Sequence, residues 1–239
     1  MRLGNTFLAT SFVSLIAAAP PAFAEWFADL YGGAAYTPNS DMTLVVNTPG
    51  GNADHTFHDM KWDTSGELGL RAGFWFDRAR WYGMALDVFR FNANLPMQTV
   101  DTTIGMATAP ATLQKIDFAV AGFGLDVVRV RLPLATSQKY PMGRFQPYVT
   151  AGPAVFRVRV TNRGNGELTT QPAYDTAVGY KAGAGLSWQL TTGAAIFAEY
   201  RYTHFHAEPE LQGTITGVRV PMQFDLNTHH AVAGVSFHF

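Results

Sequence analysis

The chain has 239 residues, a formal net charge of −1 and no cysteine. The near-neutral balance argues against nucleic acid as the main partner, because nucleic-acid binding leaves an excess of basic residues. The absence of cysteine excludes disulfide bonds and thiol chemistry, and the length suits a single domain.

The N-terminal segment has the pattern of a secretory signal peptide. An apolar stretch too short to cross a bilayer comfortably follows Arg2 and ends at the small-x-small site Ala22-Phe23-Ala24. We therefore expect a signal peptide at residues 1–24 and a single mature domain at residues 25–239. An uncleaved N-terminal anchor is the alternative, although no stop-transfer flank follows.

Beyond this segment, the apolar residues alternate with other residues instead of forming one long run. Hydrophobic residues make up 47% of the chain, yet no stretch of about 18 apolar residues is present to make a membrane helix. A period of two predicts β-strands, and each run is long enough to cross a bilayer as a tilted strand. The eight runs occupy residues 26–36, 62–76, 81–92, 116–131, 145–161, 177–190, 195–206 and 223–239.

The two faces of each run differ in a way that favours a narrow barrel. In "SGELGLRAGFWF", Leu68 and Leu70 lie on one face while Glu67 and Arg71 lie on the other. A soluble β-sandwich would carry many more charges on its outer face, whereas here the non-apolar face is glycine with isolated charges. We expect an all-β fold, a transmembrane eight-stranded antiparallel up-and-down β-barrel with a side-chain-filled interior.

The connections between the runs alternate in length, as they do between the periplasmic turns and outer loops of such barrels. We expect long, polar outer loops without a shared strand pattern at residues 37–61, 93–115, 162–176 and 207–222. An aromatic girdle is expected near the periplasmic strand ends, formed by Trp26, Phe27, Trp75, Trp81, Tyr82, Trp188, Phe237 and Phe239.

The last run, "AVAGVSFHF", remains strand-like to the final residue. We expect it to pair with the first strand and close the cylinder. It resembles the C-terminal targeting signal of bacterial outer-membrane barrels at Gly234, Phe237 and Phe239, whereas Val232 stands where that signal prefers a polar residue. The resemblance implies the barrel assembly machinery as a partner.

A wider resemblance is carried by "WFADLYGGAAY", "GELGLRAGFWF", "GMALDVFRF", "GRFQPYVTAGPAVF", "FAEYRYTHF" and "HHAVAGVSFHF". In these segments the chain resembles the eight-stranded outer-membrane β-barrels of the OmpA-like, opacity and porin-like superfamily. The resemblance implies a monomeric barrel in the bacterial outer membrane, in contact with membrane lipid and lipopolysaccharide. It implies a fold and a compartment, and it names no activity.

Charges of both signs fall on the face expected to line the lumen. Inside a narrow barrel they should pair, because an unpaired buried charge is costly. A network that fills the lumen and fixes strand register is the favoured interpretation over a conducting or catalytic site. The expected members are Asp29, Glu67, Arg71, Asp87, Asp126, Lys181, Glu199 and Arg201.

Four histidines near the outer ends of the last two strands invite comparison with a lipid A deacylase of the same barrel size. That enzyme uses a serine, a histidine and an acid, but here His204 is followed two residues later by His206 instead of serine. Without a nucleophile, histidine and carboxylate make no acyl-transfer site. We therefore expect no enzyme, with these side chains and the pair His229-His230 at the headgroup level.

The segment "NADHTFHDM" places Asp54, His55, His58 and Asp59 close together. Imidazole and carboxylate can bind divalent metals, but the spacing matches no strong metal motif. A polar loop explains the segment equally well, so we expect neither a metal nor another cofactor.

Two positions fit poorly with regular strands. Pro153 cannot donate to a sheet ladder, so we expect a bulge around Gly152-Pro153. Asp117 and Asp126 fall on opposite faces of their run unless a bulge intervenes.

The function expected from the sequence is structural or surface-interacting. Loops on a rigid barrel carry specificity, so adhesion or contact with an extracellular ligand is the leading hypothesis. The alternatives are a narrow porin-like channel for small solutes and a lipid A-modifying enzyme.

Overall fold

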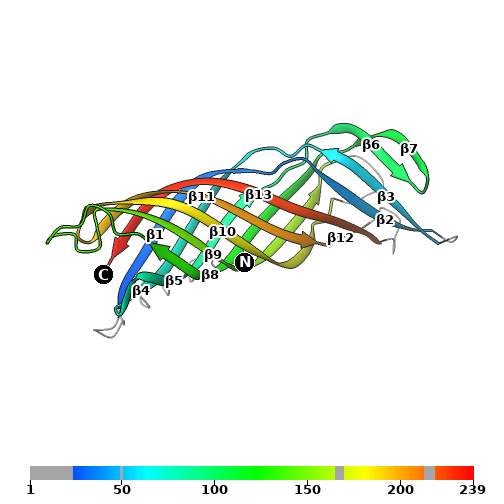
Figure 1. Ribbon diagram of the computed structural model, residues 1–239. Helices are drawn as coiled ribbons and strands as arrows, with labels where there is room; N and C mark the ends of the chain where they lie inside the picture. The colour runs from blue at the N-terminus through cyan, green and yellow to red at the C-terminus, as the bar shows by residue number, and fades with distance from the viewer. Residues whose placement is uncertain (1–23, 49–50, 165–169, 213–218) are drawn as a thin grey trace, which may run out of the picture.

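The computed structural model describes residues 24–48, 51–164, 170–212 and 219–239 (Figure 1). The described residues form thirteen strands and contain no helix long and apolar enough to cross a membrane. Eight strands form a closed antiparallel ring, which confirms the expected fold. Around the barrel they are β1 (Ala24–Tyr36), β4 (Ser65–Phe76), β5 (Ala79–Asn92), β8 (Ile116–Arg131), β9 (Phe145–Asn162), β10 (Ala173–Thr191), β11 (Ala194–Ala207) and β13 (Arg219–His238). Apart from Ala24, the expected signal peptide lies outside the described residues.

The ring closes where the first and last strands meet. β13 pairs with β1 from Phe27 opposite His238 to Tyr36 opposite His229. The backbone N–H of Phe239 donates to the carbonyl of Trp26 at 2.9 Å, which extends the ladder to the last residue. The outward-facing half of "AVAGVSFHF" is exposed as its alternation predicts, because the ring leaves these side chains on the outer surface.

Five further strands stand where loops were expected, so the prediction of long connections without strands is wrong. They are β2 (Ser40–Thr48), β3 (Gly51–Met60), β6 (Gln98–Ile104), β7 (Ala107–Leu113) and β12 (Glu210–Gln212). β2 pairs with the outer part of β13, β3 pairs with β6, and β12 pairs with β13. The tall ring strands offer free backbone groups beyond the ring, and the hairpins satisfy them.

The barrel has two different ends. The connections at one end are mostly short, and the C-terminus lies there; we call it the turn end. The hairpins β2–β3 and β6–β7 lie at the other, which we call the hairpin end (Figure 1). β13 has 20 residues, and a tilted strand of that length rises about 50 Å along the barrel axis. An apolar membrane band needs only about 25 Å, so the wall continues well beyond it.

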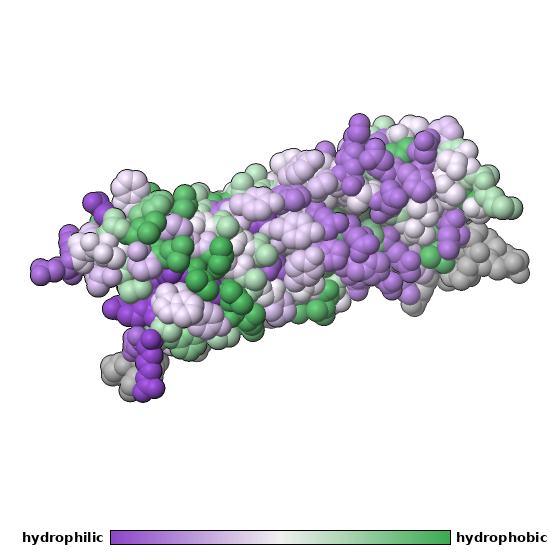
Figure 2. All heavy atoms as spheres, viewed as in Figure 1, coloured by the Kyte–Doolittle hydropathy of each residue, from purple (hydrophilic) through white to green (hydrophobic). Residues whose placement is uncertain are grey.

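Several of the long strands reverse their polarity along their length, and β9 is an example. Near the turn end of β9, Val149 faces outward while Gln146 and Thr150 face the lumen. Near the hairpin end of the same strand, Phe156 is fully buried while Arg157 is exposed. The apolar side chains therefore move from the outer surface to the interior. Figure 2 shows the result, with hydrophobic side chains gathered toward the turn end and hydrophilic ones toward the hairpin end.

The expected aromatic girdle is correct in part. Trp26 and Trp188 are exposed on the outer surface, but Phe27 and Trp75 are buried in the lumen. The two lumen rings lie 4.7 and 5.3 Å from the guanidinium carbon of Arg129. An arginine packed on aromatic faces gains cation–π attraction, which explains why these rings point inward.

A bulge lies opposite Gly152-Pro153, but the extra residue belongs to β8. The pairing of β8 with β9 shifts between Gly124 and Val128. A Cβ at Gly152 would lie 1.7 Å from the carbonyl oxygen of Leu125, so only glycine allows the bulged backbone to approach so closely. Asp117 faces outward and Asp126 inward, as strict alternation requires, and the face changes after Asp126.

Replacing residues 40–58 with a short linker should destabilise the barrel, although the sequence by itself suggests a dispensable loop. The replacement removes the buried Met42 and Phe57 and uncovers Phe224. We expect a loss of more than about 3 kcal/mol, since each large core side chain contributes about 2–5 kcal/mol. Denaturant unfolding in detergent micelles measures it, with Met106→Ser at the exposed β6–β7 tip as the control. Equal midpoints for the linker variant and the wild type would contradict this expectation.

Deleting Phe239 should slow assembly more than it weakens the finished barrel. The residue adds one backbone hydrogen bond, and its ring is 68% exposed, so little packing is lost. Its place in the C-terminal targeting pattern predicts slower insertion. The heat-dependent gel shift measures both quantities, as the rate at which the folded band appears and its final fraction. Unchanged rates would remove the targeting role of Phe239.

Candidate functional site

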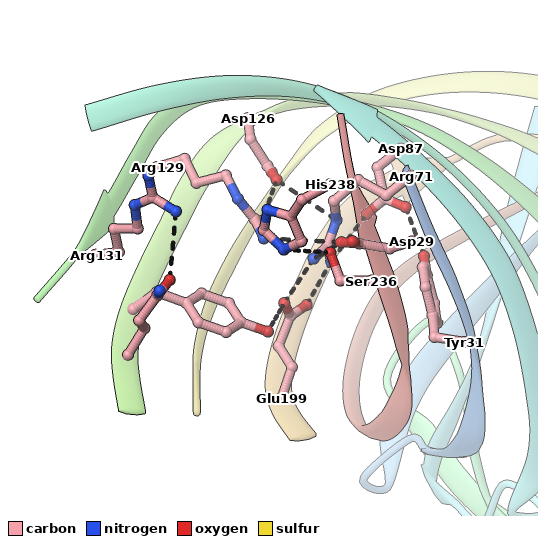
Figure 3. Close-up of polar contacts among 12 residues, drawn as sticks. Asp29, Tyr31, Arg71, Asp87, Asp126, Arg129, Arg131, Glu199, Ser236 and His238 are labelled. Atoms are coloured by element: carbon pink, nitrogen blue, oxygen red, sulfur yellow. Dashed lines mark hydrogen bonds and ion pairs between the residues drawn. The ribbon is translucent and has the colours of Figure 1, made fainter. Parts of the chain in front are cut away.

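The lumen contains the densest cluster of charged side chains among the described residues. All eight side chains expected there lie inside the ring, each with 3% or less of its surface exposed. They come from six of the ring strands, and Figure 3 shows several of them pointing toward one another inside the ring. The eight residues are Asp29, Glu67, Arg71, Asp87, Asp126, Lys181, Glu199 and Arg201.

Arg71 lies at the centre of this network. Its two terminal nitrogens donate to the two carboxylate oxygens of Glu199 at 2.7 and 2.9 Å. The same guanidinium lies 3.4 Å from Asp29, 3.5 Å from Asp87 and 3.7 Å from Asp126. A planar fork of five N–H donors can contact several carboxylates at once, which an ammonium group cannot do with fixed geometry.

A second arginine and a lysine complete the centre of the network. Arg201 donates to Glu199 at 2.8 Å and to Glu67 at 3.1 Å. It also lies 3.4 Å from Asp87, and the ammonium group of Lys181 contacts that same carboxylate. Each of these carboxylates therefore faces at least one cation from another strand.

Strict alternation does not predict the inward position of two further lumen arginines. Arg129 lies 3.5 Å from Asp126 and 3.7 Å from Asp29. Arg131 donates to Glu25 at 2.7 Å, nearer the turn end. Strict alternation from the inward Asp126 would place both arginines on the outer face, and the bulge in β8 brings them inside. The only signal in the sequence was the misfit around Pro153.

His230 also belongs to the network, whereas the sequence suggests a place at the headgroup level. It is fully buried; its Nδ1 lies 2.5 Å from Glu67, and its Nε2 lies 2.9 Å from the hydroxyl of Thr203. Phe89 and Phe91 pack edge-on against its ring. Its partner in the sequence, His229, points outward.

The charges of the buried cluster nearly balance. Five carboxylates, Asp29, Glu67, Asp87, Asp126 and Glu199, face four permanent cations, Arg71, Arg129, Lys181 and Arg201. Two tyrosine hydroxyls satisfy further carboxylate oxygens, from Tyr31 to Asp87 at 2.5 Å and from Tyr148 to Glu199 at 2.9 Å.

Inward-facing glycines provide the space for these large side chains. A Cβ at Gly124 would lie 2.5 Å from Cε of Lys181, and one at Gly69 would lie 2.3 Å from the ring of Tyr31. Carbon atoms do not approach so closely, so a larger residue at either position would displace its neighbour. Eight strands leave an interior just wide enough for side chains to fill.

An apolar plug closes the lumen between the network and the hairpin end. The rings of Phe156 and Phe205 stack with their centroids 4.3 Å apart. Phe118 packs edge-on against Trp62 and Phe224, which are both buried. We define the plug as the buried side chains Phe89, Phe91, Phe118, Val120, Phe156, Val158, Val160, Phe205 and Phe224.

The turn end is more open. A void of about 20 Å³ reaches Asp29 and Arg129 from the turn-end side. A larger cavity of about 300 Å³ lies at the mouth, lined among others by Glu25, Arg80 and His238. Both are on the turn-end side of the charged network, so they do not extend into the apolar plug.

Three of the other histidines, all near the hairpin end, have no serine hydroxyl among their side-chain partners in the described part of the chain, whereas His238 at the turn end lies 3.2 Å from the hydroxyl of Ser236 and 2.8 Å from Glu25. His204 Nδ1 lies 2.7 Å from the amide oxygen of Asn227. His206 lies on the exposed rim, where hydrogen bonds to Glu208 and Asp225 raise the pKa of its imidazole. His229 Nδ1 lies 2.5 Å from the hydroxyl of Tyr200. No serine hydroxyl is among these partners.

The first hairpin brings together only part of the residues considered for a metal. His58 lies 3.1 Å from Asp41, and the backbone N–H of Asp59 also donates to that carboxylate. These hydrogen bonds, first that of the backbone N–H, lower the pKa of Asp41. Asp54 and His55 lie further along β3. In the described residues, no group of three or more histidine and carboxylate side chains is placed to hold a metal ion.

Comparison with known proteins identifies a family and a fold. A family model described as an outer membrane protein beta-barrel domain matches residues 7–239. The solved structure of OprG from Pseudomonas aeruginosa is 17% identical, covers 90% of this chain and 96% of that chain, and has a TM-score of 0.53. No curated protein matched the sequence. At this identity the likeness to OprG shows a shared fold and nothing about activity.

Two further solved structures show weaker likeness. The neisserial surface protein NspA is 15% identical with a TM-score of 0.45, and it covers 88% of this chain and 97% of that chain. The outer membrane protease OmpT from Escherichia coli is 10% identical with a TM-score of 0.49, covering 92% and 99% respectively. Neither likeness transfers a function to this chain.

Changing Arg71 or Glu199 to Ala should destabilise the barrel strongly. Either change leaves charged partners buried without compensation, at a cost of about 3–5 kcal/mol. The double variant should lose less than the sum of the two single losses, because it removes both partners of the bidentate pair. Denaturant unfolding in micelles gives these values, with Arg78→Ala in the exposed β4–β5 turn as the control. Additive losses would show that the two residues do not depend on each other.

Proposed function

Because the chain belongs to the outer membrane protein beta-barrel domain family, we propose that it is a sealed barrel that presents its hairpin end outside the cell. The protein is located in the bacterial outer membrane. The apolar outer surface near the turn end sits in the lipid, and the β2–β3 and β6–β7 hairpins project beyond it. The role is structural or surface-interacting, through adhesion or ligand contact.

The filling of the lumen is the observation that carries this proposal. The charged network occupies the middle of the barrel, with Arg71 and Arg201 each less than 3% exposed. The apolar plug occupies the next level toward the hairpin end. An ion that entered from the turn end would have to displace paired charges and then cross an apolar core, and both steps are costly.

The projecting hairpins supply the contact surface. At the tip of β6–β7, Ile104 is 46% exposed and Met106 is fully exposed. Met97, just before β6, is 66% exposed. Large apolar side chains held on a rigid hairpin in water favour contact with another molecule. The chemical class of that molecule stays open.

The histidine that invites comparison with a lipid A deacylase lacks, among the described residues, the partners of an acyl-transfer site. The imidazole of His204 bonds to an amide oxygen, and no nucleophile stands beside it. The network carboxylates are paired with cations and enclosed by the barrel wall, so no substrate reaches them. We therefore propose a non-enzymatic protein without a cofactor.

A narrow channel for small solutes is the second candidate. The observation that favours it is the 300 Å³ cavity at the turn end, which could serve as an entry vestibule. Opening would require the network to rearrange and the plug to move aside. The assembly machinery and membrane lipid remain proposed partners of a monomeric barrel in either case.

Conductance measurements in planar bilayers distinguish the two candidates. We expect the wild type to show no steady current, because the network and the plug block the lumen independently. Arg71→Ala should give transient openings at most, since the plug remains, and Arg78→Ala should resemble the wild type.

A steady wild-type current would contradict the sealed barrel. If Arg71→Ala then changed ion selectivity without lowering stability, these residues would line an open pore, and the channel would be the better proposal.

A further inference from the structure

On four neighbouring strands, the outer surface changes from apolar to basic within two residues along each strand. One row of paired residues is wholly apolar: Leu70, Val88, Phe123, Val155 and Val178, on β4, β5, β8, β9 and β10. The next row toward the hairpin end runs from Arg90 on β5 through Ala121 on β8 to Arg157 and then Thr176 on β10. The apolar surface therefore ends here, and a basic surface begins.

Arginine side chains dominate this second row and the one beyond it. Arg90, Arg157 and Arg159 are all exposed. Arg157 donates to the hydroxyl of Thr176 at 2.7 Å and lies 5.1 Å from the ring of Tyr174, which holds its guanidinium on the surface. Among the described residues, no carboxylate forms an ion pair with any of the three arginines.

Negative charge is scarce on the same face. Beyond the apolar row, the described outer faces of β5, β8 and β9 carry one carboxylate, Asp117. Its Oδ2 already accepts a hydrogen bond from Arg163 at 2.7 Å, and Lys115 lies 3.8 Å away. The patch therefore keeps an excess of uncompensated positive charge.

Small side chains separate the arginines on the outer wall. Arg90 and Arg157 are both directly opposite Ala121, on its two sides. Strands are about 4.8 Å apart, which puts the two arginine backbones about 10 Å apart. Ala121 and Ala119 form a floor of methyl groups. Two long guanidinium side chains on either side of such a floor can reach one anionic group together.

We infer that this patch binds the phosphorylated headgroup of an outer-leaflet lipid. The position decides the occupant, since the patch lies one row beyond the apolar side chains that face acyl chains. A headgroup phosphate of a lipid packed against Val88, Phe123 and Val155 would sit at the level of Arg90 and Arg157. The inference rests on the proposed orientation, with the hairpin end outside the cell, and it does not depend on what the hairpins contact.

Lipid A with two phosphates, titrated into the full-length protein in detergent, tests the inference by native mass spectrometry. Arg90→Gln/Arg157→Gln should weaken binding at least tenfold, because each charge-assisted hydrogen bond contributes about a factor of ten. Lys61→Gln/Arg78→Gln, which removes two exposed cations elsewhere, should bind like the wild type. A folded gel band for each variant shows that the barrel is intact.

Two further ligands test whether the patch recognises a lipid phosphate or any soluble polyanion. Dephosphorylated lipid A should bind the wild type at least tenfold more weakly and should not distinguish it from Arg90→Gln/Arg157→Gln. Dextran sulfate should bind weakly to both. Equal affinity of both proteins for diphosphorylated lipid A overturns the inference. Discrimination with dextran sulfate alone also overturns it, and would point to a soluble polyanion.

Discussion

A strand that crosses lipid has no water to satisfy its backbone, so the ring must close, and the rest of the structure depends on that closure. The pairing of β1 with β13 closes it. Closure with eight strands makes the interior narrow, and a narrow interior must be filled by side chains. The buried arginines and carboxylates are the polar way of filling it. They require partners from several strands at once, so they also hold the strands in register.

Side chains alternate between the two faces along the whole of a strand, but the apolar ones face outward within the lipid and inward beyond it. Within the lipid, apolar side chains face outward and polar ones face the lumen. Beyond it, water surrounds the wall, so Phe156 and Val158 turn to a dry interior while Arg157 and Arg159 face outward. The hairpins then cover that interior, with Met42 and Phe57 as part of the core. The outer half of the barrel is stabilised as a soluble protein is, by apolar burial.

The two means of filling the lumen also explain the proposed function. The charged network is rigid because each member touches more than one partner, and the plug above it offers no polar group to a passing ion. A barrel closed by both the network and the plug can act as a rigid anchor that holds the hairpins at a fixed distance from the membrane. The arginine patch stands where the apolar outer surface ends, and we infer that it holds neighbouring lipid headgroups there.

The period-two pattern determined the eight strands of the ring, its closure and the inward position of eight charges, because lipid and lumen impose opposite polarity on successive residues. Arg129 and Arg131 could not be placed, since a bulge in β8 shifts their face and arises from its packing against Gly152-Pro153. The hairpins and the inward turn of His230 were also decided by tertiary structure. Their strand pairing and burial depend on partners distant in sequence, and a local pattern carries no information about those partners.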